Sequence, residues 1–191
     1  SAFLLAACNR RLFSFGASAD ALRSLWSHSL YTALLAEQLA RFVEALHPPS
    51  CFLHGLLHDI GGALLVQIFD EVHAEGEVTF TPREVEETVI ALHGQFGSTL
   101  AQRWGFDAEM AAVARHHHDF LEAPEDRRAA VALIALADHL AIGAGHGDEA
   151  RQFEGADSEH PAATSLALSA GNIASCLQGA AQAYEAMSGL V

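Results

Sequence analysis

Residues 55–61 read Gly-Leu-Leu-His-Asp-Ile-Gly, so an imidazole and a carboxylate stand side by side in an otherwise apolar segment. Phe52 and Leu53 precede this segment at helical spacing, which indicates a helix that packs into a core. A buried polar group costs free energy unless it is hydrogen-bonded, paired with an opposite charge or bound to an ion. His58 and Asp59 therefore need partners from elsewhere in the chain.

Four other apolar helical segments are interrupted in the same way by a histidine or an aspartate. These residues are His28, His93, the pair His117-His118, and Asp138. The costs of burying them on separate helices are best offset together, if the side chains converge on one or two cations. Imidazole nitrogen and carboxylate oxygen suit divalent Zn, Mn, Fe or Ni. Histidine is also unusually common, with 12 residues against 10 lysines and arginines.

The first half of the chain shows helical periodicity. Apolar residues recur every three to five positions from 20 to 46, and Pro48-Pro49 is expected to end that helix. Ser50 is expected to cap a second helix, which stops at Gly61-Gly62, and a third covers residues 63–74.

The second half of the chain continues in helices. Thr81 and Glu84 are expected to form a capping box, with Pro82 in the first turn, and to start a helix ending at Gly105. We expect Asp107 to cap a short helix into residues 116–118, a helix over 125–142, an exposed acidic loop over 143–160, and one final helix from about 161. The stretch 77–81 is too short for a sheet. The sequence predicts one all-α globular domain of six to eight helices over 1–191.

Composition limits the partners. The chain has 191 residues, 51% of them hydrophobic, and a formal net charge of -14, so bulk nucleic acid and anionic membrane surfaces are excluded as partners. One small phosphorylated ligand is not excluded, because a bound cation inverts the local field. The most apolar later run, 129–144, is too short for a membrane span and is interrupted by Asp138. Three distant cysteines without a CxxC pair predict a reducing, cytoplasmic location.

The order of a histidine, a His-Asp pair, further histidines and a late aspartate resembles the HD superfamily of helical metal-dependent phosphohydrolases. The surroundings of the motif residues, at 25–29, 55–61 and 97–106, are most similar to the HDOD branch, over roughly residues 7–140. The resemblance implies an HD-domain-like helical fold in a bacterial signalling protein, with signalling domains or proteins upstream as partners. HDOD modules also have a helical half before the point where this chain begins, so we expect a fragment.

The resemblance also implies a two-metal centre. His28, His58, Asp59 and Asp138 would hold one ion, and Asp59, His93, His117 and His118 the other. Asp59 would bridge the two divalent ions and is the expected catalytic residue. Such a pair lowers the pKa of a shared water and clamps a phosphate. Because ligand histidines must be neutral, ion affinity should fall as the pH drops towards their usual pKa of about 6.5. His116 is an alternative ligand if the register shifts by one.

Two departures bear on function. The HD-GYP branch, which hydrolyses cyclic di-GMP, has a lysine where this chain has Gly62, and a Gly-Tyr-Pro stretch where this chain has residues 119–124. Cyclic di-GMP hydrolysis is therefore weakly supported. We expect a signal-transduction module that acts by ligand or partner binding. The alternatives are a metal-dependent phosphohydrolase or phosphodiesterase acting on a nucleotide or cyclic nucleotide, and a helical scaffold without metal.

The remaining histidines are assigned other roles. His54 is expected to pack or to support the ligands, and His139 to face away from Asp138. Solvated side chains are expected at His47, His73, His146 and His160.

Overall fold

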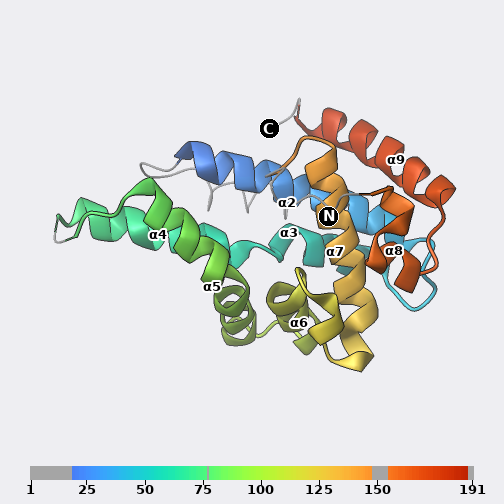
Figure 1. Ribbon diagram of the computed structural model, residues 1–191, viewed down its shortest axis with the longest axis horizontal. Coiled ribbons are helices and arrows are strands. Elements are labelled where there is room, and N and C mark those ends of the chain that lie inside the picture. Colours follow the sequence, from blue (N-terminus) through green and yellow to red (C-terminus); the bar gives the residue numbers. More distant parts are fainter. Residues whose placement is uncertain (1–18, 77, 148–154, 189–191) are drawn as a thin grey trace.

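The computed structural model describes residues 19–76, 78–147 and 155–188 (Figure 1). Every regular element within these residues is helical, which confirms the predicted all-α class. The α-helices are α2 (Ala19–Ala40), α3 (Pro48–Leu57), α4 (Ile60–Ala74), α5 (Pro82–Arg103), α6 (Ala108–His116), α7 (Arg128–Gly143), α8 (Pro161–Ser165) and α9 (Ala170–Ser188). Short 3-10 turns lie at Phe120–Glu122, Glu125–Arg127 and Asp157–Glu159.

Helix α7 is the centre of the fold. Every residue from Ala130 to Ile142 is buried, including the polar residues Asp138 and His139. Helix α2 packs against α3, α7 and α9, while α4 and α5 pair with each other and extend to one side of the molecule (Figure 1). A small cluster of Leu22, Ile60 and Ala63 joins α2 to the start of α4. The molecule thus has an aliphatic core around α7 and a helical pair that reaches away from it.

The two prolines at 48 and 49 begin a helix, so the prediction that they end one is wrong. Helix α2 already ends at Ala40, and Pro48 and Pro49 occupy the first turn of α3. The first turn of a helix leaves its N–H groups unpaired, so the missing N–H of proline costs nothing there. Ser50 is consequently not the cap. Its hydroxyl lies 3.1 Å from Nδ1 of His47, the residue that precedes the helix.

The predicted stop at Gly61-Gly62 is also wrong, because both glycines lie inside α4 and are buried. A Cβ added at Gly61 would collide with the backbone oxygen of His93 and lie 2.5 Å from the backbone nitrogen of Gly97. Glycine at 61 therefore serves the close approach of α4 to α5. Glycine costs about 1 kcal/mol relative to alanine in a helix interior, and the packing of the helical pair offsets that cost.

The predicted caps of the next two helices are confirmed. The Thr81 side chain accepts a hydrogen bond from the N–H of Glu84, and Glu84 accepts one from the N–H of Thr81 at 2.8 Å. Asp107 accepts a hydrogen bond from the N–H of Met110 at 2.8 Å, which starts α6. Helix α7 begins at Arg128, three residues later than expected, because residues 125–127 form a 3-10 turn.

The single C-terminal helix expected from residue 161 is in fact two helices. Ala167, with a φ of 54°, breaks the path between α8 and α9. Ser169 then starts α9, because its hydroxyl accepts from the N–H of Asn172 while its own N–H donates to the Asn172 side chain at 3.0 Å. This reciprocal pair is a local sequence signal for a second helix start.

The acidic loop 143–160 is not wholly exposed. Part of it, residues 148–154, lies outside the described residues. His146 stacks on Tyr31 with ring centroids 4.2 Å apart, and His160 stacks on His139 at 4.8 Å. The prediction of solvated side chains at these two histidines is therefore wrong, because each finds an aromatic partner.

One stretch, Pro48–Ala74, is long and apolar enough to cross a membrane by length and composition, with a mean hydropathy of 1.4. It consists of α3 and α4, which are separated at His58 and Asp59. Some 61% of its apolar 18-residue segment is buried, as expected for helices that belong to a core.

Candidate metal centre

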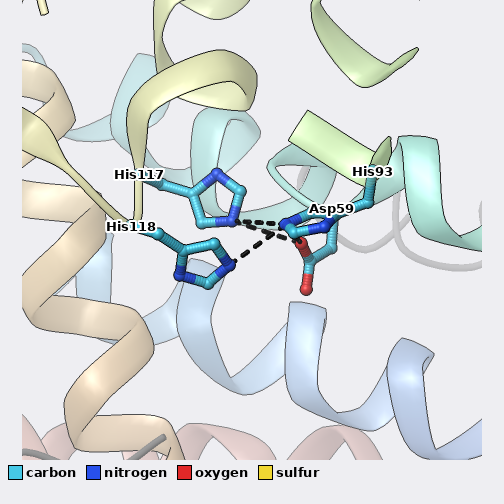
Figure 2. Close-up of side chains that lie close together, drawn as sticks. All are labelled: Asp59, His93, His117 and His118. Atoms are coloured by element: carbon cyan, nitrogen blue, oxygen red, sulfur yellow. Dashed lines mark hydrogen bonds and ion pairs between the residues drawn. The ribbon is translucent and has the colours of Figure 1, made fainter. Parts of the chain in front are cut away.

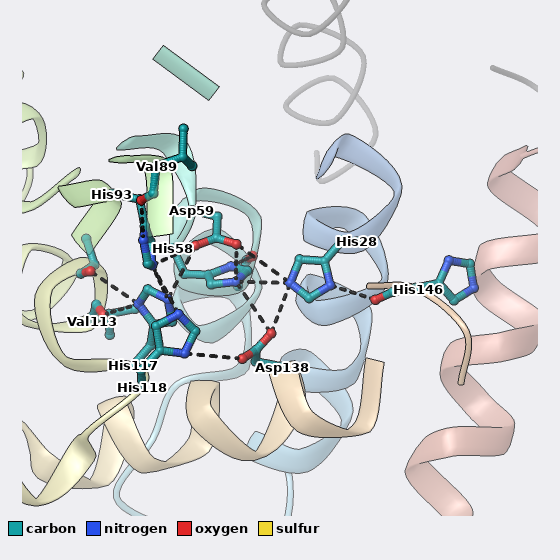
Figure 3. Close-up of polar contacts among 12 residues, drawn as sticks. His28, His58, Asp59, Val89, His93, Val113, His117, His118, Asp138 and His146 are labelled. Carbon is teal, nitrogen blue, oxygen red and sulfur yellow. Dashed lines mark hydrogen bonds and ion pairs between the residues drawn. The ribbon is translucent and has the colours of Figure 1, made fainter. Parts of the chain in front are cut away.

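The seven residues singled out by the sequence come together at one place in the structure (Figure 3). They arrive from different elements: α2, the α3–α4 junction, α5, the residues after α6, and α7. The seven are His28, His58, Asp59, His93, His117, His118 and Asp138. We call them the His/Asp cluster.

Close helix contacts at glycine bring these elements within reach of one another. A Cβ at Gly55 would lie 2.7 Å from the Cα of Ala33, so α3 lies directly against α2. A Cβ at Gly94 would lie 3.1 Å from the carbonyl oxygen of Ala114, so α5 lies against α6. Together with Gly61, these positions allow side chains from separate helices to converge.

The junction of α3 and α4 presents the His-Asp pair. α3 ends at Leu57 and α4 begins at Ile60, so His58 and Asp59 occupy the two residues between the helices. His58 is fully buried. Asp59 is the residue before α4, yet its carboxylate makes no capping hydrogen bond. Both oxygens of this carboxylate therefore face the cluster.

Backbone carbonyls orient four of the five histidines. Each ring has its Nδ1 within hydrogen-bond distance of a carbonyl oxygen: 2.7 Å from His28 to His146, 2.8 Å from His58 to Gly55, 3.0 Å from His93 to Val89, and 3.2 Å from His117 to Val113. A carbonyl oxygen only accepts, so each Nδ1 carries the hydrogen. In the neutral ring Nε2 then carries no hydrogen and has a lone pair. All four Nε2 atoms point into the cluster.

One half of the cluster lies beside Oδ1 of Asp59 (Figure 2). The Nε2 atom of His93 is 3.4 Å from that of His117 and 3.0 Å from that of His118. Oδ1 of Asp59 is 3.3 Å from His117 and 3.6 Å from His93. Ligand atoms about 2.0–2.2 Å from one ion, at tetrahedral or octahedral angles, are separated by about 2.9–3.5 Å. The observed spacings are close to that range.

The other half lies beside Oδ2 of Asp59 (Figure 3). The Nε2 atoms of His28 and His58 are 3.3 Å apart, and Oδ2 of Asp59 lies 3.4 Å from His58 and 3.8 Å from His28. Asp138 adds Oδ1 at 3.0 Å from Nε2 of His28. Asp59 therefore offers one oxygen to each half, which is the arrangement that a bridging carboxylate requires.

The charges of the cluster are strongly perturbed. Burial lowers the pKa of His28, but Asp138 and Asp59 outweigh it and raise that pKa to about 9. Burial lowers the pKa of His58 to about 4. Burial opposes ionisation of Asp138, but its contacts with His28 lower its pKa to about 2. In the absence of ions, the half around His28 is thus held by a proton that an ion would displace.

The residues present fit divalent ions. Oδ1 of Asp59 is buried and makes no hydrogen bond of acceptable geometry with any described residue. The Nε2 atom of a neutral ring that donates at Nδ1 is an acceptor, so a convergence of such atoms suits a cation. An ion in each half would be bound by these Nε2 atoms and by the Asp59 carboxylate. A donor set of imidazoles and carboxylates suits Zn, Mn, Fe or Ni.

A cleft of about 730 Å³ opens onto the cluster. It runs between α2 on one side and α4 and α5 on the other. Five cluster residues line its inner end: His28, Asp59, His93, His118 and Asp138. The side chain of His118 is 40% exposed, more than that of any other cluster residue. A small molecule can therefore reach both halves from solvent.

Other candidate residues lie apart. His116 lies outside both groups of converging ligand atoms, so it does not replace His117 or His118. His54 is buried but faces Glu109 at 3.8 Å. His139, next to Asp138, points its Nε2 to Asp157 at 3.1 Å, as its position one residue on predicted.

The sequence did not reveal the supporting role of His146 at the cluster. Its carbonyl accepts from Nδ1 of His28, and its ring lies against Tyr31 and Tyr184. Ser27 adds contacts to His146 Nδ1 at 3.0 Å and to the Tyr184 hydroxyl at 2.7 Å. The ligand-orienting atom is a backbone oxygen, which any residue carries, so no side-chain pattern could have revealed it.

An all-helical fold that gathers histidines and aspartates around a His-Asp pair defines the HD type of domain. The HDOD domain family model matches residues 1–120, and the chain belongs to this family. The matched part contains six of the seven cluster residues. Asp138 lies beyond it and reaches His28 through the fold.

Two relatives place the chain further. It is 28% identical over 130 residues to an uncharacterized protein of Treponema pallidum (strain Nichols), which covers 62% of this chain but 25% of that protein. The crystal structure of an HDOD domain protein with unknown function from Geobacter sulfurreducens matches its fold with a TM-score of 0.65 at 24% identity. That match covers 89% of this chain and 63% of the other. The chain thus spans about a quarter of the first relative and under two thirds of the second.

Proposed function

We propose that the chain is a signal-transduction module in which the His/Asp cluster holds two divalent ions and acts by binding a ligand or partner. The observation that carries this proposal is Asp59, whose two oxygens face separate sets of inward-pointing Nε2 atoms. Such a convergence of polar groups in an apolar helical shell is costly without a cation. The family membership agrees with a signalling role.

The roles of the residues follow from their positions. His28, His58 and Asp138 would hold one ion, and His93, His117 and His118 the other, with Asp59 between them. When bound, the ions would supply positive charge that binds phosphate and acidifies water. The backbone carbonyls keep Nε2 of four rings turned inward, so the site needs little rearrangement on ion binding.

Metal analysis tests the proposal. Protein stripped with a chelator and reloaded with Mn²⁺, Fe²⁺ or Zn²⁺ should hold two ions per chain by elemental analysis. Replacement of the exposed His47 by Gln should leave this number unchanged, since His47 lies outside the cluster. A ratio of zero after reloading would contradict the proposal and favour a helical scaffold.

A second function, a metal-dependent phosphohydrolase or phosphodiesterase, is favoured by the cleft. It exposes ligand atoms of both halves, so a substrate phosphate can reach the position of either ion. A panel of nucleotides and phosphodiesters, incubated with protein loaded with two ions, separates the functions. Turnover supports the enzyme, and no turnover with both ions bound supports the binding module.

Location and partners complete the proposal. Cys51 and Cys176 are free and buried in the described part of the chain, which agrees with a reducing cytoplasm. The chain matches a quarter of a longer relative. We therefore propose that signalling domains or proteins upstream are its partners, and that their state is transmitted to or from the cluster.

A further inference from the structure

We infer that the cleft over the His/Asp cluster binds a ligand with one phosphate group and an apolar body, such as the phosphate monoester of a long-chain alcohol. The inference rests on the proposed metal centre, because the ions would hold the phosphate. It goes further by assigning the remainder of the cleft, which the ions do not use, to an apolar chain or ring.

The walls of the cleft beyond the cluster are apolar. They include Leu25 on α2, Val66 and Phe69 on α4, and Val89 and Ile90 on α5. The ring of Phe69 packs edge-on against that of Phe80 with centroids 4.8 Å apart, which fixes both rings in the wall. These side chains are only partly buried, so their apolar surface faces the cleft. An apolar cleft with a few convergent polar groups at one end is typical of small-molecule sites.

No lysine or arginine lines the described part of the cleft, and its one histidine outside the cluster is the exposed His73. The whole sequence contains no lysine, since all ten of its basic residues are arginines. Arg23 and Arg83 lie on the same helices as the walls, but each pairs with a neighbouring carboxylate, Asp20 and Glu87. Phosphate recognition without ions normally relies on such cations. Away from the cluster the cleft therefore offers a phosphate no ammonium or guanidinium group.

The charges in the cleft favour one phosphate over several. Two divalent ions beside the carboxylates of Asp59 and Asp138 would leave two positive charges, which one phosphate monoester dianion neutralises. Away from the cluster, the acidic residues in the lining are Asp70 and Glu86. A second phosphate, as in a nucleoside diphosphate or a cyclic dinucleotide, would approach these carboxylates and be repelled. An apolar body would meet the hydrophobic walls.

A series of alkyl phosphates tests this inference. Binding of inorganic phosphate and of butyl, hexyl and octyl phosphate to the ion-loaded protein is measured by calorimetry, with a cyclic dinucleotide as comparison. Affinity should rise with chain length, up to about fourfold for each methylene group that becomes buried. The cyclic dinucleotide should bind more weakly than octyl phosphate.

Two isoleucines provide a matched pair of variants. Ile90 and Ile68 are exposed to similar extents, 47% and 42%, but Ile90 lines the cleft and Ile68 does not. Ile90→Gln should reduce the affinity for octyl phosphate several-fold and leave that for inorganic phosphate unchanged. Ile68→Gln should change neither. Both positions are partly solvated, so both variants are expected to fold.

The outcomes separate the inference from the metal proposal. Elemental analysis of the same samples reports whether the ions are bound. Two bound ions with equal affinities for all phosphates, equal effects of the two variants, or tighter binding of the cyclic dinucleotide would overturn the ligand assignment alone. Absence of bound ions would overturn the metal proposal and this inference with it.

Discussion

The two halves of the His/Asp cluster differ in charge and in access to solvent. The half around His28 and His58 has two carboxylates, Asp59 and Asp138, and belongs to the core helices α2 and α7. The half around His93 and His117 has three imidazoles and one carboxylate, and its His118 is exposed to the cleft. More negative charge and deeper burial should make the first half bind its ion more tightly. The second half should exchange its ion first.

Asp59 is the residue that both halves share, so its removal should have the largest effect. Asp59→Ala should lose both ions, whereas His28→Ala should lose one and keep the ion beside His93. Elemental analysis of reloaded variants measures this directly. Equal losses in the two variants would show that the halves are not joined by Asp59.

Gly61 ties the His93 half to the rest of the fold. Gly61→Ala should push α4 away from α5, at a cost of about 1–3 kcal/mol in the free energy of unfolding, as for other overpacked sites. Because His93 moves with α5, this variant should lose the ion in the half around His93 and keep the ion in the half around His28. Thermal unfolding and metal content report both effects.

Gly62→Ala is the control for this prediction. A Cβ at Gly62 meets nothing nearer than a side-chain atom of Val89 at 3.5 Å. Alanine should therefore be tolerated, or should stabilise α4 by up to about 1 kcal/mol through helix propensity. Comparable destabilisation by both substitutions would show that the crossing of α4 and α5 is not set by Gly61.

The pH dependence sharpens the contrast in a graded way. In the ion-free protein the pKa of His28 is raised from 6.5 to about 9, so its pair with Asp138 stabilises fully below pH 6.5 and is lost as the pH rises through 9. An ion must displace this proton. The apparent affinity of the protein for the ion should therefore rise by about tenfold per pH unit, for each proton released, between pH 6.5 and 9. The gain in melting temperature on adding metal should grow from pH 6.5 to 9, and a constant gain would contradict the assignment.

Local signals in the sequence predicted much of the fold. The capping box at Thr81 and the cap at Asp107 were readable because each acts within four residues. The role of Gly61 could not be predicted from the sequence, because its partner is the backbone of His93, far along the chain. The break between α8 and α9 was missed although Ser169 and Asn172 form a local pair.

The cluster itself was predictable for a different reason. Polar residues such as Asp138 that interrupt apolar helices need partners, and the order of these residues matched a known family pattern. The convergence of all seven in the structure follows from that need, while metal binding stays a prediction. The atoms that orient the imidazole rings could not be predicted. They are backbone carbonyl oxygens, such as those of Gly55 and His146, and every residue has one.

The contact between His146 and the C-terminal helix links two distant parts of the molecule. The imidazole of His146 is packed between Tyr31 of α2 and Tyr184 of α9, while its carbonyl holds His28. A shift of α9 would therefore change the direction in which a ligand atom points, without any change at the ligand itself. Helix α9 is thus connected through His146 to His28 and the buried charges of the cluster.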